Sequence, residues 1–175
     1  MKEDMKSKAL SKLNSNGSSR LLTQLNSCVH CGLCAESCLY YEAFREARFI
    51  PAKKVELVAS VYRRYYTLTG KTLPWLTGAK ELDDNMIAEM IDLLYGACTM
   101  CGRCNLHCSI GLDIAHVVFT GRSMLADMNL VPDTLQATVD AAIKTGNNMA
   151  IPTHELVDTI KWLEEDLRME VNDDN

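Results

Sequence analysis

Eight cysteines are the residues of this sequence whose type and spacing point most clearly to chemistry. They fall into two runs with the same spacing, C-x2-C-x2-C-x3-C, and the second run repeats the first at an offset of 70 residues. The first run contains Cys28, Cys31, Cys34 and Cys38, and the second contains Cys98, Cys101, Cys104 and Cys108. The polar start of the sequence, residues 1–12, lacks the apolar core of a secretion signal. We therefore expect metal ligands and not structural disulfides.

The spacing of each run predicts the ligands of an iron-sulfur cubane. A cubane has four iron corners that each need one thiolate, and three cysteines two residues apart let one tight loop reach three of them. Two runs therefore predict two [4Fe-4S] clusters with all eight cysteines as ligands. A cluster with four thiolates has no open coordination position, so it is suited to moving electrons and not to activating a substrate. We expect no catalytic residue in this chain.

Structural zinc is the main alternative, because zinc takes four tetrahedral ligands, commonly from two C-x2-C pairs. The third cysteine at the same gap fits zinc poorly, and a zinc-stabilised, non-redox interaction module remains the second hypothesis. A redox sensor, in which cluster loss changes partner binding, is the third. The formal charge of -5 and the pI near 5.4 argue against nucleic-acid binding in any of them.

Other residues within the two runs are candidates for supporting roles. Gly32 and Gly102 each follow the second cysteine of their run, which predicts a backbone conformation open mainly to glycine. His30 and His107 are expected outside the ligand set, since each run already supplies four cysteines. Arg103 either raises the potential of a nearby cluster or faces solvent, and the sequence leaves both open.

The apolar pattern outside the cysteine runs is helical. Pro51 begins a helix with an apolar stripe from Val55 to Tyr65, and Asp83 or Asp84 caps a second helix that ends near Gly96. Further stripes span residues 114–128, 135–143 and 156–167. No alternating strand pattern is found, so the sequence predicts an all-α fold around two metal sites.

The domain organisation follows from these patterns. Residues 1–19 are polar and predict a flexible N-terminal tail, residues 20–130 the two-cluster domain, and residues 131–175 a C-terminal helical extension that docks a partner. No apolar stretch approaches the roughly 18 residues that a membrane span needs. A cytoplasmic location is expected.

The runs resemble those of bacterial two-cluster ferredoxins, in which the fourth cysteine of each run ligates the other cluster. This resemblance implies one cluster on Cys28, Cys31, Cys34 and Cys108, and a second on Cys98, Cys101, Cys104 and Cys38. Bacterial ferredoxins place proline after the fourth cysteine, whereas Leu39 and Ser109 stand there in this sequence. The departure, together with the long helical spacer, points to the α-helical ferredoxin type.

The motifs Cys28-Val-His-Cys-Gly-Leu-Cys and Cys98-Thr-Met-Cys-Gly-Arg-Cys resemble the small two-cluster subunit of heterodisulfide reductase, its C-type subunit, over residues 20–130. That resemblance implies electron relay between a flavin-containing, A-like protein and a catalytic, B-like protein with Cys-Cys-Gly motifs. The segment from Gly121 to Leu125, together with Gly146-Asn147-Asn148-Met149 and the acidic helix downstream, looks closer to the related complexes of sulfur oxidisers. This implies disulfide, thiol or sulfur metabolism. An iron-sulfur subunit of another anaerobic oxidoreductase is the remaining alternative.

Overall fold

The computed structural model describes residues 2–15 and 18–168, and every regular element in that part of the chain is helical. The predicted all-α fold is therefore confirmed. The elements in chain order are α1 (Lys2–Ser15), α2 (Ser18–Ser27), η1 (Leu33–Ala35), α3 (Leu39–Phe44), η2 (Ala47–Phe49), α4 (Pro51–Tyr66), α5 (Leu68–Thr72), α6 (Pro74–Thr77), α7 (Asp84–Met90), η3 (Ile91–Gly96), α8 (Arg103–Leu106), α9 (Ile114–Asp127), α10 (Asp133–Thr145) and α11 (Thr153–Leu167).

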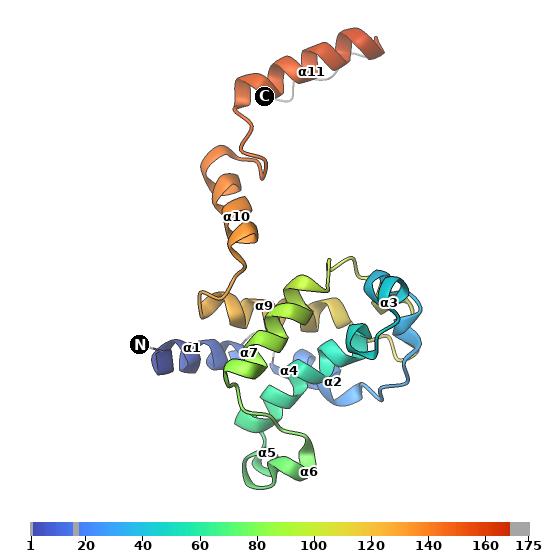
Figure 1. Cartoon of the computed structure of the whole chain (residues 1–175), viewed down its shortest axis with the longest axis vertical. Helices are drawn as coiled ribbons and strands as arrows, with labels where there is room; N and C mark the ends of the chain where they lie inside the picture. The colour runs from blue at the N-terminus through green and yellow to red at the C-terminus, as the bar shows by residue number, and fades with distance from the viewer. Residues whose placement is uncertain (1, 16–17, 169–175) are drawn as a thin grey trace. The chain divides into compact units, whose positions relative to one another are not determined.

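The chain divides into two compact units. The N-terminal unit runs to Val131 and holds α1 to α9 with both cysteine runs, and the C-terminal unit begins at Pro132 and holds α10 and α11. Within the N-terminal unit, α5 and α6 lie together at one end and α3 lies at another (Figure 1). Helices α4 and α9 pack against each other, and α1 and α2 pack against both.

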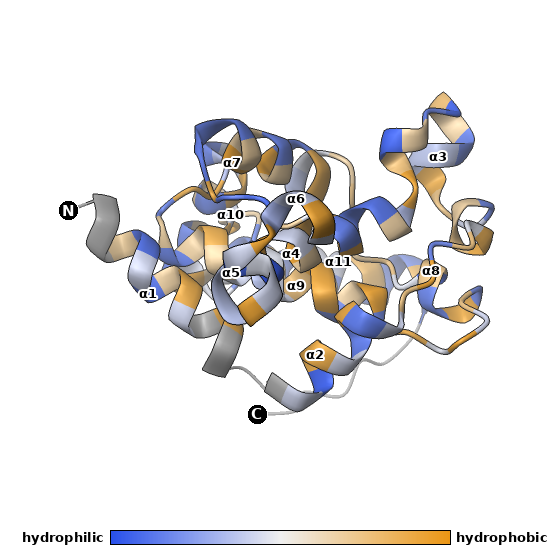
Figure 2. Ribbon diagram, turned by 90° about the horizontal axis from the view of Figure 1, so that it is seen from below, coloured by the Kyte–Doolittle hydropathy of each residue, from blue (hydrophilic) through white to orange (hydrophobic). Residues whose placement is uncertain are grey.

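Helix α4 forms where the sequence predicts it, because Pro51 occupies its first turn and its apolar residues recur at helical spacing. Val55, Val58 and Val61 are each at most 1% exposed and form the centre of the core. Helix α2 carries hydrophobic residues on one side and hydrophilic residues on the other, as Figure 2 shows. The core therefore forms by burying one side of each helix.

The second predicted helix is continuous but changes its geometry. Asp83 caps α7 by accepting a hydrogen bond from the Met86 amide, as its side chain suggests. From Ile91 to Gly96 the helix widens to π geometry, in which the Ala97 amide donates to the Asp92 carbonyl oxygen five residues back. The widened turn leads directly into Cys98, so it sets where the second cysteine run begins.

The N-terminal segment differs from the flexible tail expected over residues 1–19. Residues 2–15 form α1, and its Ala9 and Leu13 are at most 1% exposed within the shared core. The Tyr66 hydroxyl of α4 also donates a hydrogen bond to the Leu10 carbonyl oxygen. The few apolar residues of α1 carry too weak a periodic pattern for the sequence to reveal the helix. Packing against α9 and α4 supplies the missing stabilisation.

The C-terminal unit consists of α10 and α11, which follow the predicted stripes. Gly146 ends α10 in a left-handed conformation, and Pro152 precedes the first turn of α11, as expected. No residue of either helix is buried in the described part of this unit. Among the described residues, no helix is both long and apolar enough to cross a membrane.

Candidate iron-sulfur centre

Cysteines of both runs line a first pocket at the start of α4. Cys28, Cys31 and Cys34 of the first run lie there with Cys108 of the second. The pocket encloses about 310 Å³ of empty space, part of it open to solvent. Ala52 of α4 and Ile114 of α9 supply apolar walls.

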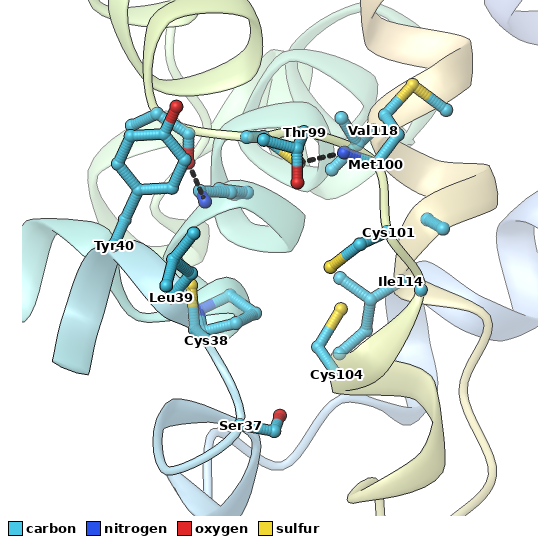
Figure 3. A pocket seen from close by; sticks show the side chains of 16 residues that line it. Ser37, Cys38, Leu39, Tyr40, Thr99, Met100, Cys101, Cys104, Ile114 and Val118 are labelled. Carbon is cyan, nitrogen blue, oxygen red and sulfur yellow. Dashed lines mark hydrogen bonds between the residues drawn. The ribbon is translucent and has the colours of Figure 1, made fainter. Parts of the chain in front are cut away.

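A second pocket gathers the other four cysteines. Cys98, Cys101 and Cys104 of the second run lie there with Cys38 of the first, around about 450 Å³ of partly open space. Cys101 and Cys104 direct their sulfur atoms into this pocket from one side, and Cys38 lines the opposite side (Figure 3). In the described ranges, no three His, Cys, Asp or Glu side chains converge closely enough to hold a single metal ion.

The two runs fold into the same loop. His30 and Met100 occupy equivalent positions and both have positive φ angles, of 54° and 55°. The glycines two residues later, Gly32 and Gly102, have φ of 83° and 73°, as the sequence predicts. A Cβ on either glycine would meet nothing within 4 Å, so a side chain would fit there. Glycine is favoured at these positions because of the positive φ angle.

The short helix after each glycine repeats as well. The Ala35 amide donates to the Gly32 carbonyl oxygen at 2.9 Å, and the Asn105 amide donates to the Gly102 carbonyl oxygen at the same distance. The fourth cysteines follow in the same way, because the Cys38 and Cys108 amides donate to the carbonyl oxygens of Ala35 and Asn105. The duplicated sequence motif therefore corresponds to a duplicated backbone turn.

Burial is the main influence on the pKa of three pocket cysteines. Desolvation raises the pKa of Cys28 and Cys34, and it raises the pKa of Cys104 to about 12. Cys101 is exposed and differs, because a hydrogen bond from the Arg103 backbone amide lowers its pKa, helped by the charge of the Arg103 side chain. Buried thiolates need positive charge beside them, which iron supplies when it binds.

The two pockets adjoin each other. Ile114, the first residue of α9, lines both, and Cys34 of the first pocket contributes to the raised pKa of Cys104 in the second. The first turn of α4 lies between them in the same way, with Ala52 on the first pocket and Pro51 on the second. Groups held in these pockets would therefore be close neighbours.

Comparison with known proteins identifies the class of site. The family model for the 4Fe-4S dicluster domain matches residues 24–112, which include all eight cysteines. The chain belongs to the 4Fe-4S dicluster domain family. It is therefore an iron-sulfur protein of the [4Fe-4S] type, and the donor set of the two pockets fits that family.

Relatives of this dicluster domain carry it within larger proteins. The chain is 35% identical over 139 residues to "Hdr-like menaquinol oxidoreductase iron-sulfur subunit 2" of Archaeoglobus fulgidus, which covers 79% of the chain and 24% of the relative. It is 38% identical over 124 residues to the "Hdr-like menaquinol oxidoreductase iron-sulfur subunit" of Archaeoglobus profundus, which covers 71% of the chain and 22% of the relative. The chain thus spans about a quarter of the length of these relatives.

A third relative is the D-type subunit of the dihydromethanophenazine:CoB--CoM heterodisulfide reductase of Methanosarcina barkeri. It is 25% identical over 150 residues, which cover 85% of the chain and 35% of the relative. The resemblance to heterodisulfide reductase iron-sulfur subunits is confirmed by these three proteins. No solved structure matches the chain.

Two positively charged side chains near the second cysteine run were not predicted from the sequence to belong to the site. Lys54 is 2% exposed, lines the second pocket and donates a hydrogen bond to the Ala97 carbonyl oxygen. Arg122 of α9 donates to the carbonyl oxygens of Leu94 and Cys98, and its guanidinium stacks over the Tyr95 ring. The sequence feature that could have revealed Lys54 is its spacing of four and seven residues from Val58 and Val61. This spacing places Lys54 on the same face of the helix as these buried valines.

The remaining residues singled out from the runs lie outside the four-cysteine groups. His30 lines the first pocket, and its Nε2 lies 3.4 Å from a Glu56 carboxylate oxygen. His107 is exposed. Arg103 is exposed, as one of its two alternatives predicts, and its charge helps to lower the pKa of Cys101. An effect of Arg103 on a cluster potential stays a prediction.

Proposed function

We propose that this chain is an electron-relay unit of a heterodisulfide reductase-like oxidoreductase and holds two [4Fe-4S] clusters. In this proposal one cluster is bound by Cys28, Cys31, Cys34 and Cys108, and the other by Cys98, Cys101, Cys104 and Cys38. When bound, each cluster accepts and releases one electron at a time. The chain's own residues hold the two clusters side by side.

One observation carries the proposal. Each pocket combines three cysteines of one run with the fourth cysteine of the other, so neither site is complete without both runs. A zinc site commonly draws its four ligands from two C-x2-C pairs, and the third cysteine at the same gap in each run fits that pattern poorly. A pair of four-cysteine pockets uses all eight cysteines, and their adjacency supports transfer between the clusters.

The proposed partners follow from the resemblance of the two cysteine runs to heterodisulfide reductase. A relay does no bond chemistry, so a flavin-containing, A-like protein and a catalytic, B-like protein with Cys-Cys-Gly motifs are proposed to flank it. The C-terminal unit is the proposed docking element, since none of the residues of α10 or α11 is buried within it. We place the complex in the cytoplasm.

The substrate of the complex is proposed to be a disulfide, a thiol or a small sulfur species. The Methanosarcina barkeri relative, named as part of a heterodisulfide reductase, supports this class. The two Archaeoglobus relatives are named as menaquinol oxidoreductase subunits, which supports a quinol as electron donor. The copurified complex tests both proposals. Menaquinol is expected to reduce its clusters, and a heterodisulfide is then expected to oxidise them.

Anaerobic purification of the full chain tests the relay itself. The expected protein is brown, contains about eight irons per chain and loses visible absorbance when dithionite is added. Copurification of a flavoprotein and a Cys-Cys-Gly protein would support the proposed partners. A colourless protein that contains zinc, or a brown one with about four irons, would overturn the two-cluster assignment.

A further inference from the structure

Lys54 is a cation enclosed by the protein beside the second pocket. Its side chain is 2% exposed, and it lines the pocket that contains Cys38, Cys98, Cys101 and Cys104. Its Nζ donates to the Ala97 carbonyl oxygen at 2.5 Å and lies 5.7 Å from the centre of the Tyr40 ring. Among the side chains that the structure describes, no carboxylate forms an ion pair with Lys54.

A buried ammonium group is costly unless negative charge compensates it. The carbonyl oxygen of Ala97 and the face of Tyr40 are neutral, so they offset only part of the cost. Four of the residues that line this pocket with Lys54 are cysteines, and their thiols become thiolates when they bind iron. A thiolate-ligated cubane has a net negative charge, and it is the counter-charge that the surroundings of Lys54 lack.

A second cation acts on the same loop. Arg122 donates to the Cys98 carbonyl oxygen, one residue beyond the carbonyl that Lys54 binds. Cations from α4 and α9 thus hold two consecutive carbonyl groups at the entry to the second cysteine run. Arg103 adds a third positive charge near Cys101.

The first pocket has the opposite electrostatic environment. No lysine or arginine is among the described residues that line it, and the Glu56 carboxylate raises the pKa of Cys28 by its negative charge. Glu56 is itself paired with Arg63 and lies near His30, so part of its charge is neutralised. The two loops have the same backbone turn, but the electrostatic environment of their cysteines is more positive at the second pocket than at the first.

We propose that Lys54 compensates the charge of the cluster bound by Cys38, Cys98, Cys101 and Cys104 and makes it the more easily reduced of the two clusters. This inference rests on the proposed function. Reduction adds one negative charge to a cluster, so a nearby ammonium stabilises the reduced form more than the oxidised form. An electron that enters the chain then resides mainly on the cluster at the second pocket, because that cluster has the higher midpoint potential.

A redox titration of the unmodified full chain gives the first test. The anaerobically loaded chain is reduced stepwise with dithionite, and electron paramagnetic resonance follows the two reduced clusters. Cys98→Ser changes the spectrum of the cluster at the second pocket and so assigns the components. The expected result is that the assigned component has the higher midpoint potential. A lower potential for that component would overturn the proposal without any Lys54 variant.

Lys54 variants then test the residue. Lys54→Met keeps the length of the side chain and removes its charge, so it lowers the potential of the second-pocket component and leaves the other unchanged. Lys54→Arg keeps the charge and the higher potential. Lys53→Met is the matched control, because Lys53 is the exposed neighbour on the same helix, and it shifts neither component.

Iron content and the potentials test the two clusters and the role of Lys54 separately. Fewer than about eight irons in the unmodified chain contradicts the two-cluster proposal itself. Full iron content with no shift in Lys54→Met, or an equal shift in both components, overturns the role of Lys54 and leaves the two clusters standing. If Lys54→Met loses iron, Lys54→Gln is measured in the same way, since it retains a hydrogen-bond donor without charge.

Discussion

Gly121 of α9 lies against Leu94 so closely that a Cβ on the glycine would come within 2.7 Å of Leu94 Cδ1. The same Cβ would lie 3.0 Å from Val58 Cγ2 of α4, and both neighbours are fully buried. Glycine inside a helix normally reduces helix stability relative to alanine. Here its missing side chain lets α9 approach η3 and α4, the elements that lead to Cys98 and to the pockets.

We therefore expect Gly121→Ala to destabilise the chain. Overpacking of a closed core costs about 1–3 kcal/mol, which exceeds the gain of roughly 1 kcal/mol from helix propensity when the core cannot relax. Gly96→Ala is the matched control, because a Cβ there meets only Asp92 Oδ1 at 3.6 Å. Urea unfolding of the two loaded variants compares them. Equal stability would show that the contact with Leu94 relaxes freely.

The hydroxyl of Tyr66 links α4 to α1, and its titration makes that link depend on pH. Burial raises the pKa of Tyr66, and its hydroxyl donates to the Leu10 carbonyl oxygen. Between the ordinary tyrosine pKa of about 10 and the raised value, only the unfolded chain has lost the proton, so the free energy of unfolding falls as pH rises. The contribution is complete below about pH 10.

Tyr66→Phe isolates this effect. At pH 8 the variant is expected to be less stable by about 1 kcal/mol, because it loses the hydrogen bond. The difference from the unmodified chain shrinks towards pH 11, since phenylalanine does not titrate. Tyr41→Phe on α3, which lies away from α1, serves as the control (Figure 1). A difference that stays constant with pH would refute the assigned role of the hydroxyl.

In the proposed ligand sets, the fourth cysteine of each run binds the cluster of the other run. This predicts which cluster each fourth cysteine affects. Cys38→Ser should alter the spectrum of the cluster bound by Cys98, Cys101 and Cys104, although Cys38 belongs to the other run. Cys108→Ser should alter the cluster bound by Cys28, Cys31 and Cys34. Electron paramagnetic resonance of the reduced variants, compared with Cys101→Ser and Cys31→Ser, makes the assignment. A spectrum in which Cys38→Ser matches Cys31→Ser would mean that each run binds its own cluster.

Removal of the C-terminal unit separates cluster binding from docking. The residues that line the two cysteine pockets all belong to the N-terminal unit. A chain ending at Val131 should therefore retain about eight irons, the content of two cubanes, and lose the copurifying partner proteins. Iron analysis and mass spectrometry of the purified material measure both. Loss of iron with the C-terminal unit would mean that the unit also supports the pockets.

The sequence by itself determined the chemistry and the helical class. Two identical cysteine spacings specify a duplicated loop, because ligand spacing and glycine at a positive φ are local properties of the chain. Helices α4, α9, α10 and α11 were also predictable, since proline, glycine and apolar periodicity act within a few residues of one another. The family comparison agrees with what these local signals indicate.

The tertiary structure alone decided which residues meet across distance. Helix α1 forms from a sequence that resembles a polar tail because α4 and α9 bury its Ala9 and Leu13. Lys54 looks like a surface lysine in the sequence, and only the packing of α4 places it beside the second pocket. Burial and long-range charge depend on the positions of residues far apart in the chain, so no local pattern reveals them.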